Sequence, residues 1–166
     1  MAKRKGQAEK RLPQTGISSL PYEVDMTATA EEVYKSLARL SKAAEAAGEY
    51  VSSHCTTFNM VRDAITRIVP NDPLSKGYAL RGDLANIFRI RKGRMRICWI
   101  ASSKMRRVCI LFISESLRKE GDVNDPYEIF KSLLESGMFD GIIQKYGVRI
   151  PTKPPYKQAV HSPPIH

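Results

Sequence analysis

Two arginine pairs with R-x-R spacing lie close together in the sequence: Arg89 and Arg91, then Arg94 and Arg96, with no carboxylate between them. Apolar residues fill most of the alternate positions, and this alternation predicts two β-strands with one charged and one apolar face. If Lys92-Gly93 is a two-residue hairpin turn, Arg91 lies opposite Arg94 and Arg89 lies opposite Arg96. Four guanidinium groups then share one face of the sheet.

Like charges directly opposite each other destabilise a pair of strands. A bound phosphate removes this repulsion, because guanidinium groups bind phosphate oxygens through paired N–H donors. The four arginines therefore predict a surface that binds a nucleic-acid backbone. The alternative is an ordinary charged sheet face in contact with water.

The same alternation extends into a third predicted strand over residues 106–114. Counting by twos places Arg107, Cys109, Leu111, Ile113 and Glu115 on the arginine side. A carboxylate surrounded by cations ionises readily and can accept a proton from a ribose 2′-OH. Glu115 is therefore a candidate general base, although it could equally serve only to neutralise Arg96 or Arg118.

The elements that position these residues follow from the hydrophobic periodicity and from the capping signals. Thr29 and Glu32 form a capping box that opens a helix, and a second helical pattern runs over residues 49–69. Three strands follow over residues 86–92, 94–101 and 106–114, and then helices begin at Asp125 and Met138. The expected fold class is α+β, with two N-terminal antiparallel helices packed on a small, mainly antiparallel twisted sheet, followed by C-terminal helices.

Length and composition divide the chain into three parts. The 166 residues suffice for one domain, which we place at residues 27–148, between a basic arm (residues 1–26) and a proline-rich tail (residues 149–166). The net charge is +10, and residues 81–120 hold eleven basic and three acidic residues. Such a concentration of positive charge favours a polyanionic partner.

Several classes of protein are excluded by what the sequence lacks. Three cysteines without CxxC spacing exclude a disulfide framework and a cysteine zinc site, and they favour a reducing, cytoplasmic location. Apolar runs are too short for a membrane span, so no membrane association is expected. The three histidines are scattered, and the sequence has neither an HExxH motif nor a compact acidic triad, so we expect no metal and no cofactor.

The segment from Arg94 to Gly137, RMRICWIASSKMRRVCILFISESLRKEGDVNDPYEIFKSLLESG, resembles the C-terminal half of the YhaV family of bacterial toxins. This family belongs to the RelE/ParE-like superfamily. The resemblance rests on the R-x-R pair that opens a strand, on the apolar strand after the next turn, and on the spacing of the residues that follow. These are Leu117, Arg118, Gly121, Asp125, Tyr127, Phe130, Leu134 and Gly137.

This resemblance implies a RelE-like fold and an endoribonuclease that cleaves mRNA, in association with the ribosome, and so inhibits translation. It also implies a cognate antitoxin similar to the swapped-hairpin DNA-binding regulators of the PrlF/AbrB type. The toxin–antitoxin complex would then bind operator DNA.

Candidate roles can be assigned for a metal-free reaction in which the 2′-OH of the RNA attacks the adjacent phosphate. The candidate catalytic residues are Arg94 and Arg96 as the phosphate clamp, Glu115 as the base, Arg118 as a second charge stabiliser, and Tyr127 as a proton donor or base-stacking group. An apolar stripe that begins at Tyr127 leaves a purely structural role open for this residue. The candidate RNA-binding residues are Arg89, Arg91, Lys92, Arg107 and Lys119.

Three other functions remain compatible with the sequence. A non-catalytic nucleic-acid-binding module needs the arginine face but neither Glu115 nor Tyr127. A basic interaction protein would prefer an acidic peptide to RNA. A relative that targets DNA gyrase is the third, since the same superfamily contains such toxins.

Overall fold

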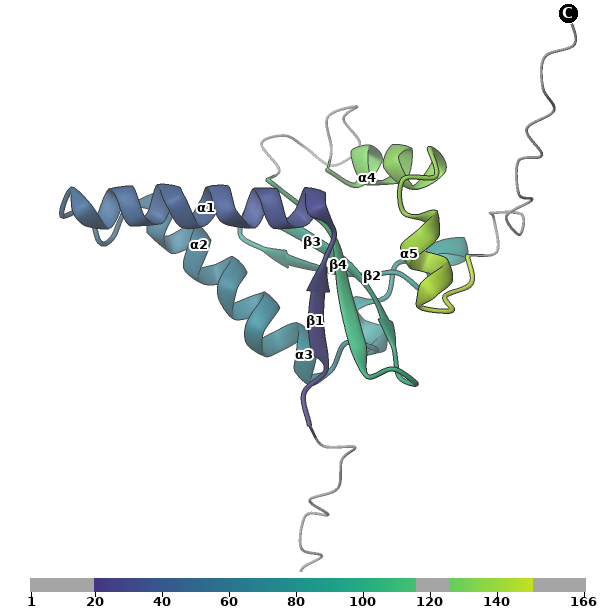
Figure 1. The fold of residues 1–166 in the computed structure, drawn as a ribbon. Coiled ribbons are helices and arrows are strands. Elements are labelled where there is room, and N and C mark those ends of the chain that lie inside the picture. The colour runs from purple at the N-terminus through teal and green to yellow at the C-terminus, as the bar shows by residue number, and fades with distance from the viewer. Residues whose placement is uncertain (1–19, 116–125, 151–166) are drawn as a thin grey trace, which may run out of the picture.

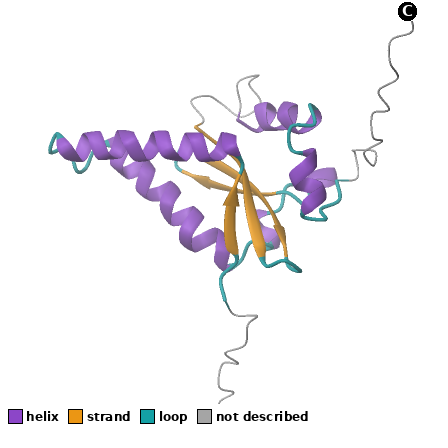
Figure 2. Ribbon diagram, in the orientation of Figure 1, coloured by secondary structure: helices purple, strands orange, loops and turns teal. Residues whose placement is uncertain are grey.

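A four-stranded sheet with helices on both sides forms the body of the protein (Figures 1 and 2). The computed structural model describes residues 20–115 and 126–150. Helices α1 (Ala28–Ala46) and α2 (Ser53–Asp63) lie on one side of the sheet, and α4 (Pro126–Glu135) and α5 (Asp140–Lys145) lie on the other. The helix that begins with α2 continues through a π-helical turn, η2 (Ala64–Ile68), into α3 (Val69–Asn71). The predicted α+β class is confirmed.

The sheet has the order β1-β4-β3-β2 and is mainly antiparallel, as predicted. Its strands are β1 (Glu23–Met26), β2 (Phe88–Lys92), β3 (Met95–Ser102) and β4 (Arg107–Glu115). Strands β2, β3 and β4 pair antiparallel, whereas β1 pairs parallel to β4, with Glu23 beside Arg107. Two short 3₁₀ turns, η3 (Lys76–Tyr78) and η4 (Gly82–Leu84), lie in the connection that leads into β2.

The basic arm is shorter than predicted, because strand β1 lies within the residues predicted for it. The sequence predicts that residues 23–26 belong to the arm, but they form the edge strand beside β4, so the domain begins at Glu23 or earlier. Four residues are too few for a clear alternating pattern, and their pairing partner lies more than eighty residues away in the sequence.

Helix α1 begins two residues before the predicted capping box. The N-cap is Thr27, whose Oγ1 accepts a hydrogen bond from the backbone N–H of Ala30 at 3.1 Å. The same hydroxyl donates to the carbonyl of Leu111 on β4 at 2.8 Å. This contact fixes the start of α1 on the strand that it crosses.

The β2–β3 turn is displaced by one residue from its predicted position. Lys92 pairs with Met95, so the two loop residues are Gly93 and Arg94 rather than Lys92 and Gly93. Gly93 has a φ of +56°, as expected for the first loop residue of a type II′ turn. As a result, Arg91 pairs with Arg96, and Arg94 occupies the turn itself.

A β-bulge in β4 reverses the faces that the sequence predicted for the end of this strand. Cys98 pairs with Phe112, but the next residue, Trp99, pairs with Ile110, so Leu111 is the extra residue. Beyond the bulge the alternation is inverted. Phe112 therefore lies on the arginine face. Ile113 and Glu115 lie on the opposite face, which corrects their predicted positions.

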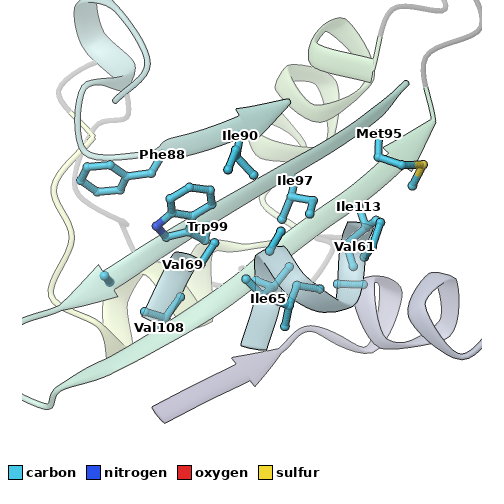
Figure 3. Packing of buried hydrophobic residues seen from close by; sticks show 14 residues of the cluster. Val61, Ile65, Val69, Phe88, Ile90, Met95, Ile97, Trp99, Val108 and Ile113 are labelled. Carbon is cyan, nitrogen blue, oxygen red and sulfur yellow. The ribbon is translucent and has the colours of Figure 1, made fainter. Parts of the chain in front are cut away.

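Two hydrophobic cores fill the two sides of the sheet. The core under α1 and α2 contains Trp99 and Phe88 (Figure 3). The ring of Trp99 lies 6.1 Å from that of Phe88 and 5.6 Å from that of Tyr78, centroid to centroid. The indole Nε1 of Trp99 donates to the carbonyl of Pro73 at 2.9 Å, which satisfies its one polar group. The second core lies under α4 and α5 and includes Phe112, Phe130 and Phe139.

Replacing Gly93 with alanine is expected to lower the free energy of unfolding by about 1–2 kcal/mol. The cause is the positive φ, because an added Cβ would meet only the flexible end of Met60, whose Cε would lie 3.2 Å away. Urea denaturation measures the change. The control is Gly77→Ala, where a Cβ would find an ordinary contact of 3.8 Å, and an equal loss in both variants would contradict the prediction.

Candidate functional site

Three of the four predicted arginines lie together on one face of the sheet. Arg91 and Arg96 are directly opposite each other, and Arg89 lies two residues along β2, opposite Cys98. The face is the predicted one, although the pairs differ from those predicted. Arg94 is exposed in the turn at the end of the hairpin. None of these arginines forms an ion pair with a carboxylate of the residues that the structure describes.

Arg96 is the most tightly held of the four. Its relative exposure is only 8 %. The guanidinium Nη1 donates to the carbonyl oxygens of Gly93 at 3.1 Å and Met95 at 3.2 Å. The hairpin turn therefore fixes the direction of this side chain, and Gly93 supports the site through its carbonyl as well as through its backbone conformation.

Tyr127, near the start of α4, connects the helices to the arginines. The guanidinium carbon of Arg89 lies 4.6 Å from the centre of the Tyr127 ring, and that of Arg96 lies 5.9 Å from it. Both distances fit cation–π contacts. Burial raises the pKa of the Tyr127 phenol more than the neighbouring Arg89 lowers it, so the hydroxyl stays protonated at neutral pH.

The contacts of Tyr127 make it a platform for two cations. A ring that already carries a guanidinium group at 4.6 Å is poorly placed to stack on a nucleotide base with the same face. The half-buried ring keeps Arg89 and Arg96 close together despite their like charges. A positioning role therefore fits the geometry better than the predicted base-stacking role.

Cys98 lies in the same row of side chains as Arg89 but contributes no nucleophile. Its side chain is fully buried, and burial raises the pKa of its thiol to about 12. The thiol is therefore neutral at physiological pH, and only a thiolate would attack a phosphate. The chemistry that this surface offers is electrostatic.

Two predicted site residues lie on the other face of the sheet. Glu115 is exposed and pairs with Met95, whose side chain belongs to the core under α1 and α2. Lys92 is the partner of Met95 from the β2 side. Because directly opposed residues share a face, neither Glu115 nor Lys92 lies on the arginine face. Glu115 differs from its predicted face because of the bulge at Leu111, and Lys92 differs because the turn is displaced by one residue.

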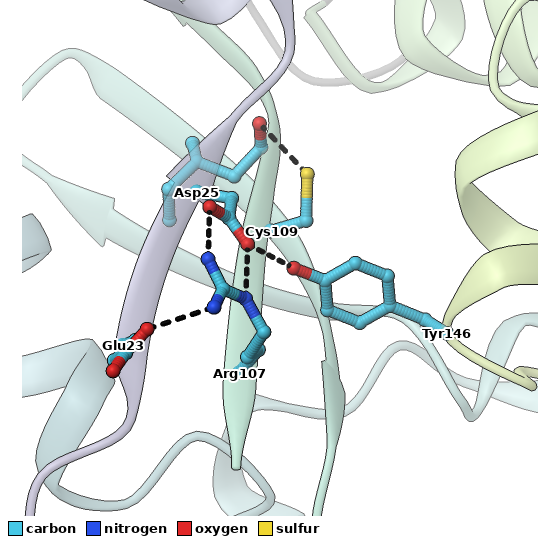
Figure 4. A network of polar contacts seen from close by, with 6 residues as sticks. Glu23, Asp25, Arg107, Cys109 and Tyr146 are labelled. Atoms are coloured by element: carbon cyan, nitrogen blue, oxygen red, sulfur yellow. Dashed lines mark hydrogen bonds and ion pairs between the residues drawn. The ribbon is translucent and has the colours of Figure 1, made fainter. Parts of the chain in front are cut away.

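Arg107 lies on the arginine face but at its far end, where carboxylates neutralise it (Figure 4). Its Nε and Nη2 donate to the two oxygens of Asp25 at 2.8 and 2.7 Å, and its Nη1 donates to Glu23 at 2.8 Å. The hydroxyl of Tyr146 donates to the same Asp25 at 2.7 Å. The predicted RNA contact of Arg107 would have to compete with two ion pairs. The predicted residues Arg118 and Lys119 lie outside the described residues.

Asp25 and Tyr146 are not among the site residues that the sequence predicts. Asp25 lies in the unrecognised strand β1, and Tyr146 lies just after α5, so neither had a local motif to mark it. The available signal was weak: one acidic residue between two apolar residues in the sequence Val24-Asp25-Met26. Only the parallel pairing of β1 with β4 brings this carboxylate to Arg107.

The pairing of Asp25 predicts how stability depends on pH. The hydrogen bonds from Arg107 are the largest of the effects that lower the pKa of Asp25, to about 2 from an ordinary value of 3.8. A lowered folded-state pKa gives stability that is complete above about pH 4 and is lost as the pH falls toward 2. Because 33 % of the Asp25 side chain is exposed, we expect only on the order of 1 kcal/mol.

Urea titrations of the wild-type protein and Asp25→Asn between pH 6 and pH 2.5 test this expectation. The difference in the free energy of unfolding should be constant near neutral pH and should shrink below about pH 4. A difference that does not change across this range would contradict the assignment.

Residues 20–115 and 126–150 hold neither a metal-ligand cluster nor a membrane-spanning helix. No three His, Cys, Asp or Glu side chains are grouped there as ligands for a metal ion. No helix in these ranges combines the length and the apolar character that crossing a bilayer requires.

The chain is similar to several solved structures and matches one protein-family model. Solved structures that resemble it include the RelBE2 toxin–antitoxin complex from Mycobacterium tuberculosis, with 23 % identity and a TM-score of 0.42 over 60 % of this chain and 95 % of that one. The isolated RelE toxin of E. coli has 13 % identity and a TM-score of 0.44 over 69 % and 97 % of the two chains. A YoeB/ParE toxin from Agrobacterium tumefaciens has 15 % identity and a TM-score of 0.42 over 56 % and 96 %.

No curated protein sequence matches the chain. A family model does match, and its match begins at β1 and ends at Tyr146, so it covers most of the 166 residues. The family is described as a toxin with endonuclease activity, of a toxin–antitoxin system. The match at residues 23–146 shows that the chain belongs to the YhaV toxin family, as its sequence suggested.

Proposed function

We propose that this toxin is an endoribonuclease that cleaves mRNA without a metal ion and uses Arg89, Arg91 and Arg96 to hold the scissile phosphate. The observation that carries the proposal is the arginine face itself. These guanidinium groups share one side of the β2–β3 hairpin, and no described carboxylate neutralises them. A phosphodiester is the ligand that fits such a surface.

RNA supplies its own nucleophile for this reaction. The 2′-oxygen forms a bond to the adjacent phosphorus, and the bond from phosphorus to the 5′-oxygen breaks. The products are a 2′,3′-cyclic phosphate and a free 5′-hydroxyl, while the proton of the 2′-OH passes to solvent water and the 5′-oxygen takes up a proton from water. Negative charge develops on the phosphoryl oxygens in the transition state, and preorganised guanidinium groups stabilise it. A DNA strand lacks the 2′-OH and would bind without being cleaved.

The candidate site residues have different roles in this mechanism. Arg96 is fixed by two carbonyl groups and is our first choice for charge stabilisation, whereas Arg94 in the exposed turn guides the strand. Tyr127 positions Arg89 and Arg96. Arg118 and Lys119 stay proposed as additional cations, and Glu115 is no longer proposed as the base because it lies on the other face.

The proposed partners follow from the family and from the charge. Members of the family are toxins of toxin–antitoxin systems, so we propose a cognate antitoxin, of the swapped-hairpin type, that neutralises this chain. The net charge of +10 supports contacts with mRNA and with the ribosome in the cytoplasm, and with operator DNA through the complex with the antitoxin.

Expression of the chain in a bacterium under a tightly controlled promoter tests the proposal. Induction is expected to stop growth and to shorten cellular mRNAs, with 5′-hydroxyl ends at the cleavage sites. The purified protein, treated with EDTA, should still cleave RNA and should leave DNA of the same sequence intact.

Three outcomes would contradict particular parts of the proposal. Soluble protein with normal growth and intact transcripts would contradict the toxin assignment for this chain. RNA binding without cleavage at matched salt would favour a non-catalytic module. Growth arrest with intact RNA and inhibited DNA supercoiling would instead indicate a gyrase-targeting relative.

A further inference from the structure

The two C-terminal helices lie across the sheet face that carries the arginines, and a tyrosine ties each end of this helical unit to that face. Tyr127, near its start, contacts Arg89 and Arg96. Tyr146, at its end, donates to Asp25, which binds Arg107. Arg96 and Arg107 lie at opposite ends of the face: Arg107 pairs with Ser102, six residues along β3 from Arg96, or about 20 Å at the usual rise of a strand.

The contact at Tyr146 is built as a fixed anchor (Figure 4). The residue is only 5 % exposed, and its hydroxyl reaches Asp25 at 2.7 Å. Arg107 binds both oxygens of Asp25, so the carboxylate cannot rotate without losing several charge-assisted hydrogen bonds. The end of α5 is thereby held to β1 and β4 in one orientation.

The region between Tyr127 and Tyr146 is close-packed, so the position of Tyr146 can affect the position of Tyr127. Phe130 of α4 lies 5.7 Å from Phe112 of β4 and 5.8 Å from Phe139, centroid to centroid. All three rings belong to one core with Tyr146. A packed interior resists small continuous shifts. Loss of the Tyr146 contact at the end of α5 is therefore expected to change how α4 and Tyr127 pack on the sheet.

We propose that Asp25 and Tyr146 are positioning residues for the arginine site: by fixing the end of α5 they place the Tyr127 ring beneath Arg89 and Arg96. The consequence for catalysis rests on the proposed RNA-cleaving function, but the structural link does not. Two measurements therefore test the two parts separately.

The first measurement is independent of activity. The Nε–H signals of Arg89 and Arg96 in nitrogen-15 NMR spectra sense the ring current of Tyr127, and Tyr127→Leu identifies them and sets the size of the full effect. In Tyr146→Phe, which retains the buried ring, we expect both signals to move part of the way toward their positions in Tyr127→Leu. The control is Tyr50→Phe, which removes a hydroxyl from a side chain that is 70 % exposed in the α1–α2 loop.

The second measurement is a double-mutant cycle on RNA cleavage. Tyr146→Phe is expected to lower kcat about three- to tenfold with little change in KM. In a Tyr127→Leu background the same change should have almost no further effect, because Tyr146 acts through Tyr127. A merely structural role would instead give equal fold-losses in both backgrounds.

Unmoved arginine signals in Tyr146→Phe would overturn the proposal, and so would additive losses in the cycle. If Tyr146→Phe does not fold, Asp25→Asn removes the anchor from the other side and has the same expected results. Moved signals in a protein that shows no RNA cleavage at all would refute the proposed function while supporting the structural link.

Discussion

Replacing Arg96 with alanine is expected to reduce the rate of RNA cleavage about a hundred- to a thousandfold, the usual loss for one preorganised charge stabiliser. Arg96 is buried to 8 % exposure and is held by the carbonyl groups of Gly93 and Met95, so its charge is already oriented before RNA binds. Single-turnover cleavage of a short RNA measures the rate constant, and growth after induction gives a second readout.

Three variants of the same protein make the Arg96 experiment specific. Arg39→Ala removes an equal charge from the exposed side of α1, where the guanidinium binds Ser36, and should leave cleavage unchanged. Arg94→Ala removes a charge from the exposed turn and should affect mainly KM. Glu115→Gln should have little effect, because the side chain lies on the opposite face. A loss in Glu115→Gln as large as that in Arg96→Ala would contradict the site described above.

Replacing Tyr127 with leucine is expected to reduce cleavage about ten- to a hundredfold, whereas replacing it with phenylalanine should change the rate less than about threefold. Leucine removes the aromatic face that holds Arg89 at 4.6 Å and Arg96 at 5.9 Å, and small displacements of catalytic groups are costly. Phenylalanine keeps this face and loses only the hydroxyl.

The comparison of the two Tyr127 variants separates positioning from proton transfer. A hydroxyl that donated a proton to the leaving oxygen would contribute about a hundred- to ten-thousandfold, and phenylalanine would then be as damaging as leucine. Equal losses in Tyr127→Phe and Tyr127→Leu, with both proteins folded, would therefore contradict the platform role. Circular dichroism and urea denaturation establish that both variants are folded.

The arginine face could be predicted from the sequence because side-chain alternation in a strand is a local property. Arg89, Arg91 and Arg96 share a face for either position of the turn, since moving a two-residue loop by one position shifts both strands together. The pairs change, but each residue keeps its side of the sheet. Within the hairpin, only Arg94 and Lys92 differ from their predicted positions, because they are the residues at the turn.

The position of Glu115 could not be predicted, because the alternation fails where β4 is buried on both faces. Ile110, Leu111, Phe112 and Ile113 are all apolar, so the pattern contains no sign of the extra residue. Long-range contacts accompany the bulge: the carbonyl of Leu111 accepts from Thr27, and Phe112 packs against Phe130. Because Leu111 is an extra residue in β4, Glu115, the predicted base, lies on the opposite face of the sheet.

The family, the α+β class, and the charged and apolar faces of the β2–β3 hairpin could all be predicted from the sequence, because each depends on residue type and short-range spacing. Which cations remain available and which are neutralised depends instead on contacts between segments that are distant in the sequence. Asp25 reaches Arg107 only through the parallel pairing of β1 with β4, and Tyr127 reaches Arg89 only through the docking of α4. Such contacts join residues tens of positions apart, and no local pattern records them, because their energy exists only once the chain has folded.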